Sequence, residues 1–183
     1  MTQQKANGFT LLELIIAIAL VALLTAIAVP SFRAVIQNNR ITAQTNDLLT
    51  AFQLARSEAV RRGRPVTICA ADVVGGGNAP TCGTNWNLGW MAVVDGVASA
   101  GSSNVAVDER LRVWYPSSEE AQITAPADLE FVRYLPRGEI DANAGAVLPA
   151  VIGLRLDDCT RDEARQIELT RSGKASAERV VCS

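Results

Sequence analysis

One apolar segment near the N-terminus limits what this chain can fold into. Between Phe9 and Phe32, 19 of 24 residues are apolar, and no charged residue occurs from Leu14 to Val29. As a helix, residues 9–29 would span roughly 30 Å, the thickness of the hydrocarbon core of a bilayer. The alternative is a buried core helix, but a chain of 183 residues is too small to cover such a helix on all sides. The segment therefore predicts a membrane-spanning helix.

The residues around this segment add two constraints. The short stretch before it is polar and carries one charged side chain, Lys5. A cleaved secretory signal is not indicated, because the apolar run is too long and leads into more helix instead of a small-residue cleavage site. Glu13 lies inside the apolar run. An unpaired carboxylate is costly in lipid, so Glu13 is a candidate functional residue, with snorkelling to the interface as the alternative.

The helix is expected to continue to about Arg62. Residues 33–62 contain neither glycine nor proline, and their apolar positions recur at helical spacing. These positions are Ile41, Leu48, Phe52, Ala55 and Ala59. Gly63 follows this stretch and is a typical residue at which a helix stops. Pro30 lacks a backbone N–H and so removes one hydrogen bond of the helix. We therefore expect one helix over residues 9–62, with a kink or a locally melted turn at Pro30.

Residues Asn7–Leu14 (NGFTLLEL) resemble the class III signal of type IV prepilins and of type II secretion pseudopilins. In that family a prepilin peptidase cuts after the glycine and methylates the new N-terminal residue. The resemblance implies a leader over residues 1–8, a cut between Gly8 and Phe9, and methylation of Phe9. It also implies that the carboxylate of Glu13 pairs with the N-terminal amine of a neighbouring subunit during assembly.

Beyond Gly63 the pattern changes to short strands separated by turns. We expect strands at Pro65–Ala71, Asn87–Asp95, Glu109–Tyr115, Leu129–Tyr134, Ala150–Leu156, Arg165–Thr170 and Glu178–Cys182. No helical pattern lies between them, so the predicted fold class is α+β, with an antiparallel β domain packed on one long helix. The segments are a leader (1–8), a transmembrane or assembly helix (9–32), its amphipathic continuation (33–63) and the β domain (64–183).

All four cysteines lie beyond the apolar segment: Cys69, Cys82, Cys159 and Cys182. An even number suits disulfides in an oxidising compartment, so we expect the β domain in the periplasm and a single pass through the inner membrane. Three pairings are possible, and we favour Cys69–Cys82 with Cys159–Cys182 because both close local loops. A four-cysteine zinc site is the alternative, but no C-x₂₋₄-C spacing occurs.

The rest of the chain is similar to the GspH/FimT family of minor pilins and minor pseudopilins. The residues that carry this resemblance are Ala55–Val60 (ARSEAV), Val66–Cys69 (VTIC), Trp86, Gly89, Trp90, Asp95, Gly138 and Ser172–Lys174. It implies a pilin-like fold and, as partners, other pilins contacted through the N-terminal helix, prepilin peptidase and the inner membrane. Three functions fit: a minor type IV pilin, a minor pseudopilin of a type II secretion system, and a DNA-binding minor pilin for natural transformation. The context of Pro30, residues 28–32, favours the pilus.

Charge and composition weigh against DNA binding and catalysis. Arg171, Lys174 and Arg179 are candidate phosphate contacts, and 15 of the 17 cations are arginine. The Gly-Arg-x-Arg motif of the DNA-binding branch is Gly-Lys-Ala-Ser here, from Gly173, and nearby acidic residues dilute the charge, so a mixed solvated surface is favoured. The chain has no histidine, which excludes Ser-His-Asp and Cys-His catalysis. We expect no enzyme activity, no cofactor and no metal.

Overall fold

The structure is a computed structural model of the chain. It describes residues 10–72, 81–97, 101–116, 121–127, 129–141, 148–157, 159 and 164–182, without the side chains of residues 27, 29–31, 33 and 34. The predicted leader over residues 1–8 and the predicted cleavage site lie outside the described residues. The chain divides into two compact units, Met1–Gln37 and Asn38–Ser183.

The predicted helix is present as α1, Leu11–Arg62. It ends where expected, because Gly63 adopts a φ of +64°, a backbone conformation that suits glycine and stops a helix. Arg61 and Arg62 occupy the last turn, where their charge favours the helix C-terminus. The backbone is helical at Pro30, and the kink expected there stays a prediction.

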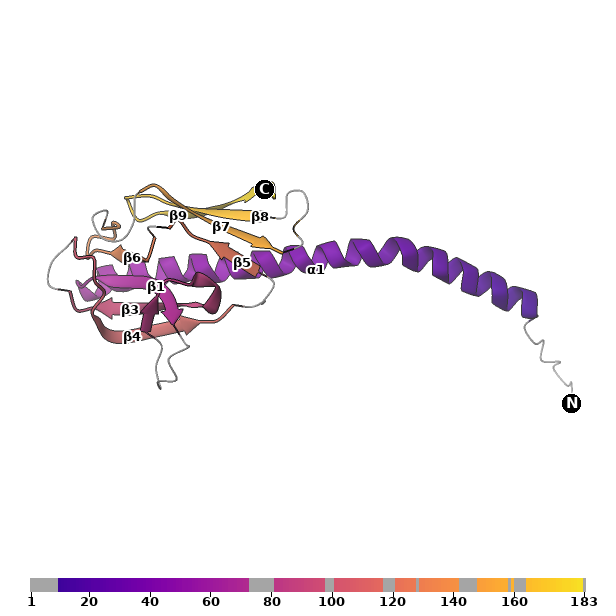
Figure 1. Ribbon diagram of the computed structural model, residues 1–183, viewed down its shortest axis with the longest axis horizontal. Coiled ribbons are helices and arrows are strands. Elements are labelled where there is room, and N and C mark those ends of the chain that lie inside the picture. Colours follow the sequence, from indigo (N-terminus) through magenta and orange to yellow (C-terminus); the bar gives the residue numbers. More distant parts are fainter. Residues whose placement is uncertain are drawn as a thin grey trace, which may run out of the picture. The chain divides into compact units, whose positions relative to one another are not determined.

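Two antiparallel sheets follow the helix (Figure 1). The first sheet contains β1 (Val66–Asp72), β2 (Thr81–Gly83), β3 (Trp90–Asp95), β4 (Val107–Trp114) and β6 (Phe131–Tyr134). Its order is β2-β1-β3-β4, and β6 also pairs with β1. The second sheet has the order β5-β7-β8-β9 and contains β5 (Ala121–Thr124), β7 (Ala150–Leu156), β8 (Ala164–Leu169) and β9 (Ala175–Val180). A short 3₁₀ helix, Trp86–Leu88, precedes β3. The α+β prediction is confirmed.

Two strands, β2 and β5, were not predicted, and the predicted starts of β3 and β9 were wrong by three residues. β3 begins at Trp90 instead of Asn87, because residues 86–88 form the 3₁₀ helix. β2 lies between the strands predicted at Pro65–Ala71 and Asn87–Asp95, and its three residues pair with the end of β1. β5 was not expected, because four residues are too few to give a clear alternation. β9 begins at Ala175 instead of Glu178. The turn before it is tight, so Ala175 already pairs with Leu169 of β8.

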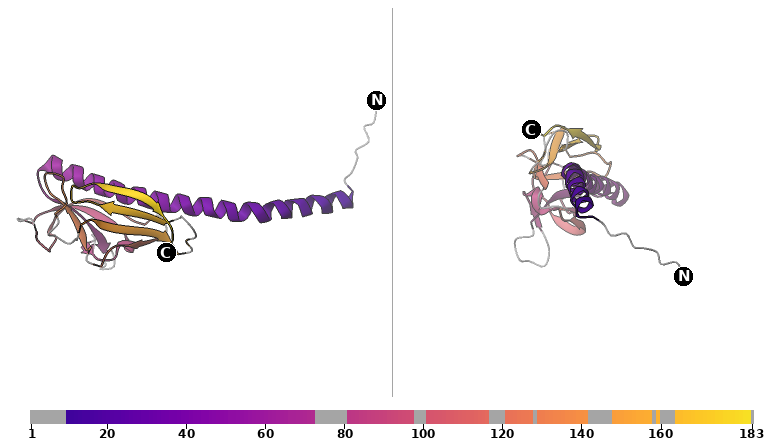
Figure 2. Two further views of the ribbon diagram at one scale, coloured as in Figure 1. Left: turned by 90° about the horizontal axis from the view of Figure 1, so that it is seen from above. Right: turned by 90° about the vertical axis from the view of Figure 1, so that its right-hand side faces the viewer.

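All core residues found in the described part of the chain lie in the second unit. The five helix positions predicted to form one apolar face, from Ile41 to Ala59, are all fully buried. They join buried residues of both sheets in one cluster, and the sheets lie against this part of α1 (Figure 2). Trp86, Trp90 and Trp114 are also buried. The second unit therefore has its own hydrophobic core, which is what an independently folding domain needs.

Candidate assembly site

The first turn of α1 is closed by a reciprocal pair of side chains. The Oε2 atom of Glu13 accepts hydrogen bonds from the backbone N–H and the hydroxyl of Thr10, both at 3.2 Å. The Thr10 Oγ1 atom in turn accepts from the backbone N–H of Glu13 at 3.2 Å. This arrangement is a capping box, which satisfies N–H groups that have no partner within the helix. Glu13 is therefore held at the N-terminus of α1, five positions after Gly8 in the sequence.

Large apolar side chains of the first unit are exposed over the whole described stretch after Thr10. More than half of the surface of each of these side chains is exposed: Leu11, Leu12, Leu14, Ile15, Ile16, Ile18, Leu20, Val21, Leu23 and Leu24. Among the described residues, no helical stretch is both long and apolar enough to span a membrane. An exposed apolar surface of this size marks a site that contacts protein or lipid.

Arg56, in the run ARSEAV, joins two turns of the second unit. Its Nε atom donates to the carbonyl of Gly138 at 3.0 Å, and its Nη2 atom donates to the carbonyl of Ser172 at 3.1 Å. Ile140 N–H also donates to the carbonyl of Arg171 at 3.0 Å. The turn after β6 and the turn between β8 and β9 are thereby held together on the helix. The run ARSEAV, Gly138 and the segment Ser172–Lys174, which all carry the family resemblance, therefore take part in one contact between the helix and the two turns.

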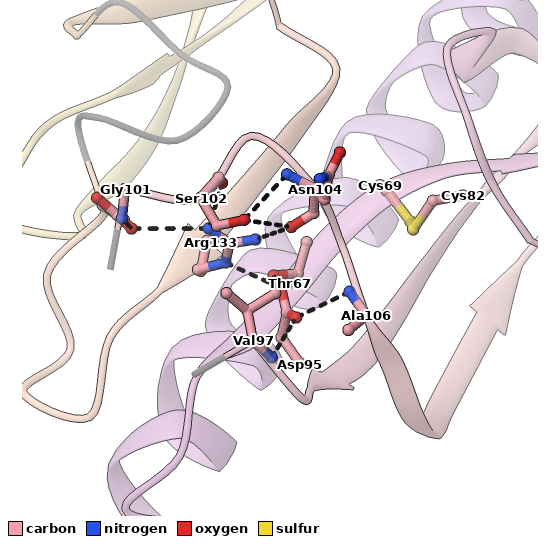
Figure 3. Close-up of polar contacts among 11 residues, drawn as sticks. Thr67, Cys69, Cys82, Asp95, Val97, Gly101, Ser102, Asn104, Ala106 and Arg133 are labelled. Carbon is pink, nitrogen blue, oxygen red and sulfur yellow. Dashed lines mark hydrogen bonds and ion pairs between the residues drawn. A yellow bond between two sulfur atoms is a disulfide. The ribbon is translucent and has the colours of Figure 1, made fainter. Parts of the chain in front are cut away.

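A buried ion pair supports the loop between β3 and β4. Asp95 and Arg133 are almost completely buried, and the Nε atom of Arg133 lies 2.9 Å from Asp95 Oδ2. Thr67 donates its hydroxyl to the same carboxylate oxygen at 2.8 Å (Figure 3). The pair brings together β1, β3 and β6, which are neighbours in the first sheet. A charge buried in this way needs a partner and further hydrogen bonds, and both are present.

The pair also binds the backbone of the loop (Figure 3). In addition, the Nη1 atom of Arg133 lies 3.7 Å from Oδ2 of the buried Asp141. Asp95 Oδ1 accepts from the N–H groups of Val97 and Ala106, both at 3.1 Å. Arg133 donates to the carbonyls of Ser102 at 2.7 Å and Asn104 at 2.6 Å. Sequence reasoning assigned no role to Arg133, and its only signal was a cation in a strand that is otherwise apolar.

The end of α1 carries a second group of charges, in which Glu58 and Arg62 are partly buried and Arg61 is exposed. Glu58 forms ion pairs with Arg61 and with Arg62, and Arg62 also pairs with Glu109 of β4. Hydrogen bonds from Arg61 and then Arg62 lower the pKa of the Glu58 carboxyl to about 2. Glu109 and Glu58 raise the pKa of Arg62. These charges tie the helix end to the edge of the first sheet.

The candidate phosphate contacts are only partly brought together. Arg171 and Lys174 lie in the turn between β8 and β9, and both are exposed. Arg179 lies near the far end of β9, opposite Arg165 of β8. Five residues of extended chain separate Lys174 from Arg179, which is roughly 17 Å. The three cations therefore do not form one cluster.

Both disulfides follow the local pairing that the spacing favours. Cys69 is bonded to Cys82 with a Cα–Cα distance of 5.5 Å, and Cys159 is bonded to Cys182 with a distance of 5.9 Å. The first disulfide joins β1 to β2, and the second joins the segment after β7 to the segment after β9. The pairs suit the oxidising compartment expected from the cysteine count.

Comparisons with known proteins agree with this architecture. The model of a family described as the type II transport protein GspH matches residues 44–173, and a model of the prokaryotic N-terminal methylation motif matches residues 3–29. Two crystal structures of the type IV minor pilin FimU from Pseudomonas aeruginosa are similar in fold. One is 20% identical, covers 76% of this chain and 89% of that chain, and has a TM-score of 0.54. The other is 18% identical, covers 75% and 91%, and has a TM-score of 0.51. No curated protein matches.

One helix that continues into a two-sheet antiparallel domain defines the fold of the type IV pilin class. The FimU structures share that fold, and the methylation motif covers the start of the helix. The chain belongs to the GspH family. This family consists of minor pilins and pseudopilins, which are structural proteins, and the predicted membership of the GspH/FimT group is confirmed.

Proposed function

We propose that this protein is a minor type IV pilin. Prepilin peptidase cleaves it between Gly8 and Phe9 and methylates Phe9, and the mature chain then enters a pilus or primes its assembly. Before assembly the chain is held in the inner membrane by one helix, with the β domain in the periplasm. Its partners are other pilins, contacted through the N-terminal helix. Its role is structural, without catalysis or a cofactor.

The observation that carries the proposal is the exposed apolar surface of α1 with one acidic residue at its start. Ten large aliphatic side chains between Leu11 and Leu24 are each more than half exposed, and packing against similar helices would remove them from water. Glu13 accepts its hydrogen bonds from Thr10 with one oxygen, Oε2. Among the described residues the other oxygen has no hydrogen-bond partner, so a positively charged amine can pair with it. Such a pair is stronger where water is excluded.

Two observations bear on the choice between pilus and secretion system. The FimU structures belong to a minor pilin of a pilus, whereas the matching family is described as a type II transport protein. Residues 28–32, around Pro30, resemble pilus subunits, and this supports the pilus. Deletion of the gene in its native host should abolish or reduce surface pili and leave type II secretion intact. Loss of secretion with normal pili would assign the protein to the pseudopilus instead.

The processing and assembly steps are tested by three variants expressed in a strain that makes the filament. Gly8→Val should leave the leader in place, which mass spectrometry of the membrane fraction detects. Glu13→Gln should still be processed, because glutamine keeps the capping box. It should fail to enter sheared filaments, because the negative charge is lost. Thr10→Ala is the matched control, since it removes the capping hydroxyl and keeps the carboxylate. Normal assembly of Glu13→Gln together with loss of assembly in Thr10→Ala would show that Glu13 acts through the helix start and not through its charge.

DNA binding is the second alternative, and it rests on Arg171 and Lys174 in one exposed turn. If phosphates are bound there, affinity for a short duplex should fall steeply with salt, and Lys174→Ala should reduce that slope by about one. Arg179→Ala should change the slope less, because Arg179 lies away from the turn. Undetectable or salt-independent binding would exclude this function.

A further inference from the structure

Two adjoining hollows lie on the β domain, away from the helix. The first has a volume of about 310 Å³ and lies between the short 3₁₀ helix and β5. The second has a volume of about 230 Å³ and lies between the end of β2 and the residues before β4. Thr84 and Glu130 line both hollows. The two hollows therefore form one groove, called the polar groove below, and no described residue of α1 lines it.

The lining of the polar groove is rich in hydrogen-bonding groups and almost free of charge. Seven of its described side chains are amides or hydroxyls: Thr84, Asn85, Asn87, Ser103, Asn104, Gln122 and Thr124. Glu130 is the one charged side chain among the described lining residues, and none of these is lysine or arginine, although the chain has 15 arginines. Phosphates and other polyanions are bound mainly by such cations. The groove therefore suits a neutral ligand that forms many hydrogen bonds.

Two of the amides are held in place by the backbone. Asn87 Oδ1 accepts the N–H of Ile123 at 2.6 Å, and Asn85 Oδ1 accepts the N–H of Asn87 at 3.0 Å. Each bond uses the side-chain oxygen and leaves the NH₂ group of the amide without a partner among the described residues. Gln122 and Glu130 also make no side-chain hydrogen bond or ion pair in the described part of the chain. Donors and acceptors are therefore left for a ligand in the same hollow.

The walls of the polar groove are fixed to the rest of the domain. The indole N–H of Trp86 donates to the carbonyl of Leu129 at 3.2 Å, which joins the 3₁₀ helix to the segment that carries Glu130. The disulfide of Cys82 holds β2 to β1, and Arg133 binds the carbonyl of Asn104 at 2.6 Å (Figure 3). A site that is already ordered loses little conformational freedom when a ligand binds.

The groove is less suited to a peptide than to a sugar. Peptides bind to a free strand edge or insert apolar side chains into pockets. The N–H of Ile123 on the edge of β5 is already taken by Asn87, and the large apolar residues of the lining, such as Trp86 and Phe131, are buried. A sugar hydroxyl both donates and accepts, so it matches amide, hydroxyl and carboxylate side chains alike.

We propose that the polar groove binds a neutral oligosaccharide. The NH₂ groups of Asn85 and Asn87 donate to sugar oxygens, the carboxylate of Glu130 accepts from a sugar hydroxyl, and Gln122 does both. The sugar chain passes Thr84 and occupies both hollows. Because the site uses no described residue of α1, it is independent of the proposed assembly function and holds for a pilus or a secretion system.

The ligand class is tested on the full-length protein in phospholipid nanodiscs, because detergents with sugar head groups would compete for the groove. The probes are chitotetraose, cellotetraose and the acidic tetramer of galacturonic acid, and saturation-transfer NMR measures their binding. At least one neutral tetramer should bind, and the acidic one should bind about tenfold more weakly because Glu130 repels it. A preference between the neutral tetramers distinguishes an N-acetylated glycan from an unsubstituted one. Binding of neither neutral tetramer, or equal binding of the acidic one, would overturn the proposal.

The location is tested by two double variants. Gln122→Ala with Glu130→Ala removes side chains that make no contact needed for folding, and it should weaken binding of the neutral tetramer by about tenfold. Gln53→Ala with Glu168→Ala is the matched control, since it removes the same residue types from exposed positions on α1 and β8, and its affinity should equal that of the parent. Thermal unfolding should give the same midpoint for both double variants. Equal affinities of the two variants would show that the sugar binds elsewhere.

Discussion

Gly173 lies so close to Gly138 that no side chain fits between them. A Cβ atom on Gly173 would overlap the carbonyl oxygen of Gly138, and the same carbonyl accepts a hydrogen bond from Arg56. Both glycines have a φ of +82°, which L side chains rarely adopt. The approach of the two turns therefore depends on glycine at both positions. Arg56 binds the backbone of both turns where they meet.

Gly173→Ala is expected to destabilise the second unit by about 1–3 kcal/mol, because it adds backbone strain and a clash with the carbonyl of Gly138. Gly153→Ala in β7 is the matched control, since an added Cβ there meets only atoms at ordinary contact distance. Urea unfolding of the fragment Asn38–Ser183, followed by the fluorescence of its buried tryptophans, measures both. Similar midpoints for the two variants would contradict this account of Gly173.

Removal of Arg133 should have a larger effect than removal of any surface cation. Arg133→Met leaves the carboxylate of Asp95 buried without its charge partner, and a loss of about 3–5 kcal/mol is expected. The control is Arg137→Met, because Arg137 pairs with Glu139 at the surface and exposed pairs contribute about 0–1 kcal/mol. Chemical denaturation of the same fragment compares the two. An equal loss in both variants would mean that the buried pair does not stabilise the first sheet.

The stability of the fragment should depend on pH through Glu58. Its folded-state pKa of about 2 lies below the value of about 4.3 for an unfolded glutamate. The stabilisation is therefore present above about pH 4.3 and is lost as the pH falls from there toward 2. Glu58→Gln should give a flatter stability profile over this window, measured by thermal unfolding in a pH series. Glu168→Gln is the control, and an identical change in both variants would argue against a specific role of Glu58.

Loss of the disulfide between Cys159 and Cys182 should destabilise the fragment by about 2–4 kcal/mol. This disulfide closes a loop with a sequence separation of 23 residues, against 13 for Cys69–Cys82, so the chain-entropy effect of its removal is slightly larger. The double variants Cys159→Ser/Cys182→Ser and Cys69→Ser/Cys82→Ser are compared with the oxidised parent by urea unfolding. An unchanged midpoint in either variant would show that the corresponding crosslink adds nothing to stability.

Local patterns were sufficient to predict α1 and its end. The apolar spacing from Ile41 to Ala59 predicted the buried face, and Gly63 predicted the last turn, because both signals act within a few residues. The short sequence separation of the cysteines likewise predicted the pairing within each local loop. The class of fold needed only the change of pattern after Gly63 and the absence of further helical patterns in the sequence.

Contacts between distant segments were not predictable in this way. Arg56 binds carbonyls 82 and 116 residues further along the chain, and no local pattern indicates which turns will meet there. Arg133 reaches Asp95 only because β1 pairs with both β3 and β6. The short strands β2 and β5 were missed for a related reason, since their partners and not their composition make them strands.

In the described part of the loop, the buried pair of Asp95 and Arg133 binds backbone atoms: the N–H groups of Val97 and Ala106 and the carbonyls of Ser102 and Asn104. Substitutions at these four positions leave those atoms in place, except that proline at Val97 or Ala106 would remove an N–H group. The loop can therefore diverge in sequence among homologues, or accept an inserted epitope by design, while its anchor to the sheet persists. The surface of the loop can therefore change its binding specificity during evolution without a loss of stability of the domain.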